Sequence, residues 1–570
     1  MLPALLVMGW TGAIGQQKVP DRSYSRVSLT IIYLDDPNPD PNFNAGIGQT
    51  VRNFFEQSKL IGPKYNDHTI STRSARVDVD NFTAENRTMI GNPKETGQIL
   101  DFVNKSDISR QVVSKWFDRQ PDGTFKMDLI GQRGLYNASD NDYITAAASQ
   151  RQFATLKDQG EKLLKVSYLL FVNISDVKYT EVKSLNSGSW SGLARGYLYK
   201  LNWNDSVSAN FYQNLWIAEG DAEAVKSAKK KAFDSTVFPI VHVKNLDVSA
   251  SKSNSPVNGV KPSDTEVITG IINSMYESLI VEIDTKVSDF QVRQGLISSK
   301  PIGATIGSKE GLYVDQRFFV FENVQNWNKQ VVQRRRAVIR AKTVVNNEKV
   351  TEGKSNPSIF YQVGGGKIDH FGMYMVQKND KGIAFTITSM KGNMGGLNGT
   401  LEYNLSRSFS KTMKLKTIPT GVNFFIDLAV NNGNYSDVEI PGYFSSRNDD
   451  FSFFRVSGGF SKDYYFLKNF HISPRIGYGI ENTSLYDKGE SGTYPDGLSA
   501  MGDHILIGGS GGLNLLHNFQ LIGGCNIYIP VGDLWMTAGS EKSVPLTMSW
   551  SKVFYGRQGL SIFGGVRILL

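Results

Sequence analysis

The chain ends in LSIFGGVRILL (560–570), a segment in which two kinds of side chain alternate. Even positions hold only aliphatic residues and glycine, whereas the odd positions include Ser561, Phe563 and Arg567. Successive side chains of a β-strand point to opposite faces, so one face is apolar and the other carries an arginine. In a chain whose mean hydropathy is only -0.27, this pattern is typical of a strand in an outer-membrane β-barrel.

The same alternation recurs from about residue 367 onward and predicts about ten strands of a length that suits a bilayer. The expected strands cover residues 371–377, 383–390, 396–406, 421–431, 454–463, 471–481, 504–516, 519–529, 546–555 and 560–570. We therefore expect an α+β multidomain chain whose residues 367–570 form an antiparallel transmembrane β-barrel of about 8–10 strands.

One face of these strands lacks charge, and the opposite faces carry residues of both signs. A lipid-facing Arg or Lys costs roughly 2–4 kcal/mol at mid-bilayer, and a barrel of this size is filled by side chains. We therefore expect the charges to line the barrel lumen and neutralise one another there. They are Glu402, Asp427, Arg455, Asp463, Arg475, Glu481 and Arg567. A soluble sandwich with its apolar faces turned inward is the alternative, and it would leave the same charges in water.

The part before the barrel mixes helices and strands. Residues 1–15 predict a secretory signal peptide, because an apolar stretch is followed by small residues. Residues 18–260 predict an α/β domain, with strands at 27–34, 168–174, 196–203 and 237–243 and helices at 46–59, 144–166 and 221–233. Residues 249–263 read as a linker, and 264–360 as a helix followed by a small β neck with strands at 317–322, 336–345 and 358–363.

Composition and motifs exclude several functions. The net charge is +8, but its densest runs, 229–231 and 334–336, lack the interleaved aromatics of a nucleic-acid groove. The single cysteine, Cys525, lies on an apolar strand face and reads as a small hydrophobe. No metal-binding, phosphate-loop or nucleophile motif is complete, so the sequence predicts neither an enzyme nor a cofactor or metal site.

Two resemblances to known families add to these expectations. Residues 513–532 (LNLLHNFQLIGGCNIYIPVG) and 555–570 (YGRQGLSIFGGVRILL) resemble outer-membrane β-barrel proteins of Bacteroidota-type bacteria, although such barrels usually end in Phe and this chain ends in Leu570. The order of strands and helices in 18–260 weakly resembles curli-secretion-type and TolB-like periplasmic domains. The resemblance implies a location in the outer membrane of a Gram-negative envelope and leaves the activity open.

Ten strands create a difficulty with topology. They place both ends of the barrel on the side of its longest connections, whereas such barrels have short periplasmic turns. Either one strand is miscounted or residues 18–360 lie at the cell surface; we expect a periplasmic N-terminal region. The expected role is structural, or assembly and docking, with outer-membrane lipid around the barrel and an envelope protein bound through 18–360. A small transport channel or ligand-binding barrel is one alternative, and a secreted soluble adhesin is another.

Overall fold

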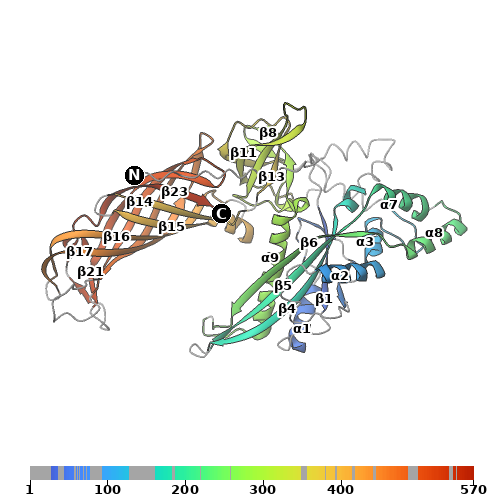
Figure 1. The fold of residues 1–570 in the computed structure, drawn as a ribbon, viewed down its shortest axis with the longest axis horizontal. Coiled ribbons are helices and arrows are strands. Elements are labelled where there is room, and N and C mark those ends of the chain that lie inside the picture. Colours follow the sequence, from blue (N-terminus) through green and yellow to red (C-terminus); the bar gives the residue numbers. More distant parts are fainter. Residues whose placement is uncertain are drawn as a thin grey trace.

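The chain folds into three successive parts, an N-terminal domain, a neck and a barrel (Figure 1). The computed structural model describes residues 27–570 except 36–43, 57–59, 61, 63, 68–69, 72, 77–92, 127–160, 183–186, 219, 257, 348–355, 379, 392–394, 414–417, 441–443, 485–498, 538–543 and 547. The expected signal peptide and residues 144–160 of the helix expected at 144–166 lie outside the described residues. None of the described helices is long and apolar enough to span a bilayer.

The N-terminal domain is a three-layer α/β structure built on a six-stranded sheet. Its sheet runs in the order β2 (Asn66–Asp67), β1 (Ser28–Asp35), β4 (Ser167–Val182), β5 (Ser187–Leu201) and β6 (Ile240–Ser253), and β3 (Ser74–Arg76) also pairs with β1. One apolar core packs this sheet against α1 (Ala45–Glu56) and α9 (Asp264–Lys286). A second core packs the other face against α2 (Pro93–Lys105), α3 (Ile108–Trp116), η3 (Phe211–Leu215), which follows α7 (Asp205–Asn210), and α8 (Glu223–Ser235).

The helix α9 belongs to this domain, although the sequence pattern grouped it with the neck. It begins with a capping box, in which the Ser263 Oγ accepts from the Glu266 N–H and the Ser263 N–H donates to the Glu266 carboxylate. Its buried face, from Val267 to Ile283, packs into the core that α1 shares. The expected linker 249–263 is shorter than predicted, because residues 249–253 continue β6.

The neck is a seven-stranded sheet in the order β7 (Arg293–Gly295), β13 (Met373–Gln377), β10 (Arg317–Gln325), β11 (Val331–Thr343), β12 (Ser358–Gly365), β9 (Ile302–Ala304) and β8 (Ser298–Ser299). Phe318, Ile339 and Phe360 contribute to its apolar core. Each of the three strands expected in this region overlaps one of β10, β11 and β12. Residues 371–377, expected in the barrel, contain β13 instead, because Met373 and Met375 join the core of the neck.

The barrel contains eight antiparallel strands, each paired with the next in sequence, and β23 closes the ring by pairing with β14. They are β14 (Ile383–Met390), β15 (Gly396–Asn404), β16 (Val422–Ile440), β17 (Phe444–Lys462), β19 (Phe470–Ser484), β20 (Ser499–Asn514), β21 (Phe519–Thr537) and β23 (Gly559–Leu569). The strand expected at 546–555 is not part of the ring. That segment contains the end of β22 (Val544–Leu546) and the short helix α11 (Trp550–Val553).

The count of eight removes the difficulty with topology. Without the strands expected at 371–377 and 546–555, the first strand begins and the last strand ends at one mouth of the barrel. The strands that flank the long connections 485–498 and 538–558 meet them at the opposite mouth. We call the end that joins the neck the near end, and the opposite end the far end. The near-end connections are 405–421, which contains α10 (Leu405–Met413), 463–469, which contains β18 (Tyr464–Phe466), and the short turn 515–518.

Candidate functional site: the barrel lumen and its two ends

The barrel is apolar on the outside and polar on the inside. Ile476 on β19, Ile562 on β23 and Leu428 on β16 are exposed by 57%, 60% and 49%, whereas the neighbouring Asp427 and Arg567 are each only 4% exposed. This arrangement is the reverse of a soluble sandwich, which buries its apolar faces. An apolar outer band around a polar interior is the surface of a transmembrane β-barrel.

All seven charged residues proposed for the lumen pair with one another inside the barrel. Nearest the neck, the Arg567 guanidinium bridges two acids, with Nε 2.6 Å from Glu402 Oε2 and Nη2 3.1 Å from Asp463 Oδ2. In the middle, Arg475 Nη1 lies 3.3 Å from Asp427 Oδ2. Towards the far end, Arg455 Nη1 lies 3.8 Å from Glu481 Oε1.

Neutral side chains fill the space between these ion pairs. Arg475 Nε donates to Asn526 Oδ1 at 2.9 Å, and its guanidinium lies 5.2 Å from the centre of the Phe563 ring. Arg455 lies 4.1 Å from the centre of the Tyr528 ring. Stacking against aromatic rings stabilises a desolvated guanidinium. The ion pairs and rings therefore occupy successive levels of the lumen.

A segment at the far end, residues 548–558, folds into the barrel; we call it the far-end plug. Its Trp550 and Phe554 are buried with Phe451 and Phe453 of β17. Gly502 of β20 makes room for the plug, since a Cβ there would lie 2.7 Å from Trp550 Cγ. The plug closes the far end with an apolar cluster.

Arg557 of the plug completes the charge balance of the lumen. Its guanidinium is ion-paired with Glu481 and lies 3.9 Å from the centre of the Phe453 ring, and Trp550 Nε1 donates to the same carboxylate at 3.0 Å. The ion-paired acids Glu402, Asp427, Asp463 and Glu481 are thus matched by Arg455, Arg475, Arg557 and Arg567. Burial of single ions is costly, so a balanced set is what a filled lumen requires.

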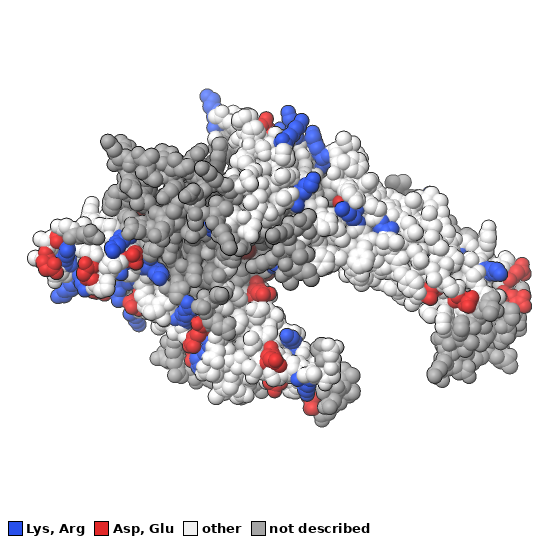
Figure 2. Space-filling view, turned by 180° about the vertical axis from the view of Figure 1, so that it is seen from behind, with Lys and Arg blue, Asp and Glu red and all other residues white. Residues whose placement is uncertain are grey.

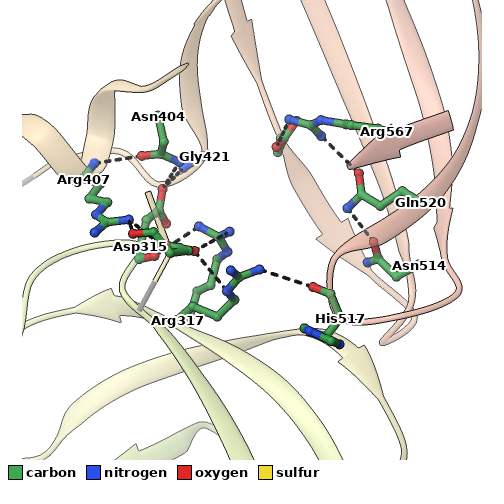
Figure 3. A network of polar contacts seen from close by, with 12 residues as sticks. Asp315, Arg317, Asn404, Arg407, Gly421, Asn514, His517, Gln520 and Arg567 are labelled. Atoms are coloured by element: carbon green, nitrogen blue, oxygen red, sulfur yellow. Dashed lines mark hydrogen bonds and ion pairs between the residues drawn. The ribbon is translucent and has the colours of Figure 1, made fainter. Parts of the chain in front are cut away.

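The neck covers the near end and contacts every connection on that rim. Asn404, the last residue of β15, and Gly421, on the connection to β16, donate to the Asp315 carboxylate at 3.1 and 2.7 Å. Asn469, between β17 and β19, accepts from the Gly365 N–H of β12 at 2.6 Å. His517, in the turn between β20 and β21, accepts from Arg317 through its carbonyl oxygen at 3.4 Å (Figure 3). Its Nδ1 also contacts Arg335.

A second ion cluster joins the neck to the barrel. The carboxylate of Asp380, in the segment between β13 and β14, lies 3.1 Å from Arg317 Nε and 3.3 Å from Arg340 Nη2, and it also pairs with Arg407 of α10. Burial, with repulsion from Arg340 and Arg407, lowers the pKa of Arg317 to about 10 against the opposing effect of Asp380. Arg317 therefore remains charged at neutral pH, and all three arginines depend on one carboxylate.

Asp315 is the polar centre of the contact with Asn404, at the end of β15, and Gly421, just before β16. The Tyr361 hydroxyl of β12 donates to Asp315 Oδ1 at 2.7 Å, and burial followed by the charge of Asp315 raises the pKa of Tyr361 well above its usual range. The hydroxyl therefore keeps its proton and remains a donor. Gly421 presents its N–H with a φ of 71°, a conformation that favours glycine. Beside this contact lies a cavity of about 20 Å³, room for roughly one water molecule.

Several residues of this site could not be found from strand alternation. Arg557 and Trp550 lie in the plug, and Asp315, Asp380 and Arg407 lie between or outside the barrel strands. For the four charged residues the only signal was charge next to segments of strand or turn character, and Trp550 was placed in the strand expected at 546–555. Across the described ranges, no group of three or more His, Cys, Asp and Glu residues is arranged to hold a metal ion.

Comparisons with known proteins give only distant likenesses. No protein-family model matches the chain, and no curated protein matches it. Among solved structures, a major outer membrane protein from Thermus thermophilus is similar to 33% of this chain and covers 99% of its own, with 12% identity and a TM-score of 0.23. Acinetobacter baumannii CarO matches 34% of this chain and 100% of its own, with 13% identity and a TM-score of 0.18. The N-terminal β-barrel domain of Pseudomonas aeruginosa OprF matches 34% of this chain over 100% of its own length, with 7% identity and a TM-score of 0.17.

The location follows from the surface of the barrel itself. Its strands close into a ring, the middle of its outer face is apolar, and the described charges of its lumen are buried and paired. A surface of this kind is stable in lipid and would aggregate in water. The C-terminal part of the chain is an outer-membrane β-barrel, and lipid surrounds its apolar face.

Proposed function

We propose that the chain is an outer-membrane anchor that holds its N-terminal domain on the periplasmic side, in a structural or assembly role. The observation that carries the proposal is the filled barrel, with three levels of ion pairs, a plug at the far end and the neck at the near end. An ion-conducting pore needs a continuous polar path of water, and side chains that pair across the lumen at three levels oppose such a path. The barrel therefore serves as an attachment.

The lengths of the strands support a periplasmic location for the neck and the N-terminal domain. The apolar outer band of β16 ends near Val430, but the strand continues to Ile440, and its last residues are mostly polar. The long connections 485–498 and 538–558 emerge at the same far end. Since outer-membrane barrels have longer extracellular loops, the far end faces outward and the neck lies in the periplasm.

The N-terminal domain is the part available to a partner. It has two apolar cores of its own and is joined to the barrel through the neck, so it presents a folded surface outside the membrane. We propose that an envelope protein binds this domain, and that the chain performs no catalysis. A transport channel is the competing role, and the filled lumen argues against it.

Conductance in planar bilayers tests the anchor against the channel. Purified full-length protein, refolded and shown to migrate as a folded barrel, is added to the bilayer over a range of voltages. We expect no stable conductance steps. Reproducible ion-conducting steps whose size is stable from one preparation to the next would overturn the anchor and favour the channel.

A further inference from the structure

The β10–β11 hairpin of the neck crosses the near end of the barrel from one side to the other. Asp315, just before β10, contacts the connection between β15 and β16. Further along, the Phe319 ring lies 5.2 Å from the His517 ring, in the turn between β20 and β21. These two connections are four strands apart in a ring of eight, so they lie on opposite sides. The hairpin therefore runs across the barrel mouth.

The part of the hairpin beyond this contact extends past the barrel wall. We call residues 322–336 the hairpin tip. Arg335, at its base, contacts His517 Nδ1 at 3.3 Å and stacks on Phe319. Because β10 and β11 remain paired from this point to Gln325 and Val331, the tip continues in the same direction. It overhangs the region where lipid surrounds the barrel.

The contact with His517 sets the level of the tip. Leu515 and Leu516, in the same turn, are 50% and 59% exposed, and on the neighbouring rim Phe466 and Phe470 are 43% and 44% exposed. Exposed aromatic and aliphatic side chains at the end of a barrel mark the boundary between lipid chains and headgroups. The tip therefore begins its overhang at the height of the headgroups.

The composition of the tip suits an anionic surface. It contains Lys329 and Arg334–Arg336, and its one acid, Glu322, pairs with Arg336 at 3.3 Å. Among the described residues, Lys329 and Arg334 have no ion-pair partner. Trp327, at the turn, is 91% exposed. Tryptophan is enriched at membrane interfaces. Figure 2 shows Lys and Arg gathered along the upper edge of the molecule, over the neck.

We propose that the hairpin tip binds the phospholipid leaflet around the barrel, with Trp327 among the headgroups and Lys329 and Arg334 on anionic headgroup phosphates. The proposal rests on the proposed function for the side of the membrane, because it takes the leaflet at the near end to be phospholipid. The contact adds a second attachment beside the barrel and fixes the rotation of the neck over the membrane. Each cation near an anionic leaflet strengthens association about fivefold.

A fluorescent probe at the tip tests the proposal in lipid nanodiscs. The full chain carries Cys525→Ser and Trp327→Cys, and the new thiol holds an environment-sensitive dye. Nanodiscs contain either phosphatidylcholine alone or equal parts phosphatidylcholine and phosphatidylglycerol. We expect the dye to be protected from an aqueous quencher in the anionic discs and much less in the neutral ones.

Two matched charge variants make the test specific. The ratio of quencher-protected to unprotected dye measures how often the tip is docked on the lipid. Lys329→Gln with Arg334→Gln should lower this ratio about 25-fold, since two cations are lost. Lys226→Gln with Lys231→Gln removes the same charge from α8 and should leave the ratio unchanged. Equal quenching in both disc types, or protection that survives Lys329→Gln with Arg334→Gln, would overturn the proposal. The nanodisc has no inside or outside of a cell, so the result is independent of the proposed periplasmic orientation.

Discussion

At the residue scale, the barrel depends on which way each side chain of a strand points. Ile562 pairs across the sheet with Cys525, in the middle of the exposed apolar residues of β21 that run from Leu521 to Ile529. Both side chains face outward, whereas the adjacent Ser561 and Phe563 are buried. Each residue of these strands therefore faces either lipid or lumen, and substitution of a single residue by Lys tests which side it faces.

Ile562→Lys should destabilise the barrel by roughly 2–4 kcal/mol, because it places a charge near mid-bilayer. Leu570→Lys is the matched control, since it also replaces an exposed aliphatic side chain with Lys. Leu570 lies at the near end of the barrel, where the penalty falls to about 0–1 kcal/mol. The yield of heat-modifiable, folded barrel and its urea midpoint measure both effects. Equal losses at the two positions would show that Ile562 does not face lipid at mid-depth.

Glu481 should be the most sensitive of the lumen acids, because it pairs with both Arg455 and Arg557. Glu481→Gln leaves two buried arginines without a full counter-charge and should cost about 3–5 kcal/mol. Adding Arg557→Met should recover part of this loss, since one unpaired cation is removed. Unfolding in urea compares the two variants, and a double variant less stable than the single one would contradict the pairing.

The sequence predicted the lumen residues that lie on strands, and the reason is local. Period-2 alternation reports the face of a strand directly, so Asp427, Arg455 and Arg567 could be assigned without a structure. Arg557 escaped the prediction because it lies in the plug, where no periodicity links position to direction. Its role depends on a tertiary contact with Glu481, which no neighbouring residue reports.

At the element scale, the same alternation misassigned two segments. Residues 371–377 alternate like a barrel strand, but they pair with β10 and β7 in the neck. Residues 546–555 alternate as well, but Trp550 and Phe554 fold into the far end, where an aromatic cluster is available. Strand pattern identifies a strand; it does not identify the sheet that the strand joins, because partner choice depends on long-range packing.

The junction between neck and barrel should depend on Asp380. Asp380→Asn removes the one carboxylate shared by Arg317, Arg340 and Arg407 and should cost about 3–5 kcal/mol. Asp369→Asn, at a half-exposed site in the same part of the chain, is the control and should change stability little. Hydrogen exchange in β10 and β11 measures the contact. Unchanged protection in Asp380→Asn would contradict the role of this cluster.

The same junction should weaken in acid through His517. Burial, followed by repulsion from Arg335, Arg317 and Lys378, lowers the pKa of His517 to about 4. An opened junction restores a pKa of about 6.5, so the open state binds more protons between about pH 6.5 and 4 and the contact loses stability as pH falls through that window. Hydrogen exchange in β10, corrected for intrinsic rates, should show this loss at low salt. His517→Gln should flatten the profile, and an unchanged slope in that variant would exclude the imidazole as its source.

At the scale of the whole molecule, a filled barrel, a neck and an α/β domain follow one another along the chain (Figure 1). Composition and alternation predicted this order, and the boundaries moved where packing between parts decided them, as for α9. The filled lumen and the neck over the near end together give the barrel an anchoring role in our account. That role requires that the near end of the barrel, and with it the N-terminal domain, faces the periplasm.

The side of the membrane is therefore the most direct test, by cysteine labelling of intact diderm cells with an impermeant maleimide. In a Cys525→Ser chain, Ser436→Cys reports the far end of β16, and Val260→Cys reports the N-terminal domain, where Val260 is 72% exposed. We predict that Ser436→Cys is labelled on intact cells and that Val260→Cys is labelled only after the outer membrane is permeabilised. Labelling of Val260→Cys on intact cells, with Ser436→Cys protected, would place the domain at the cell surface and contradict the account.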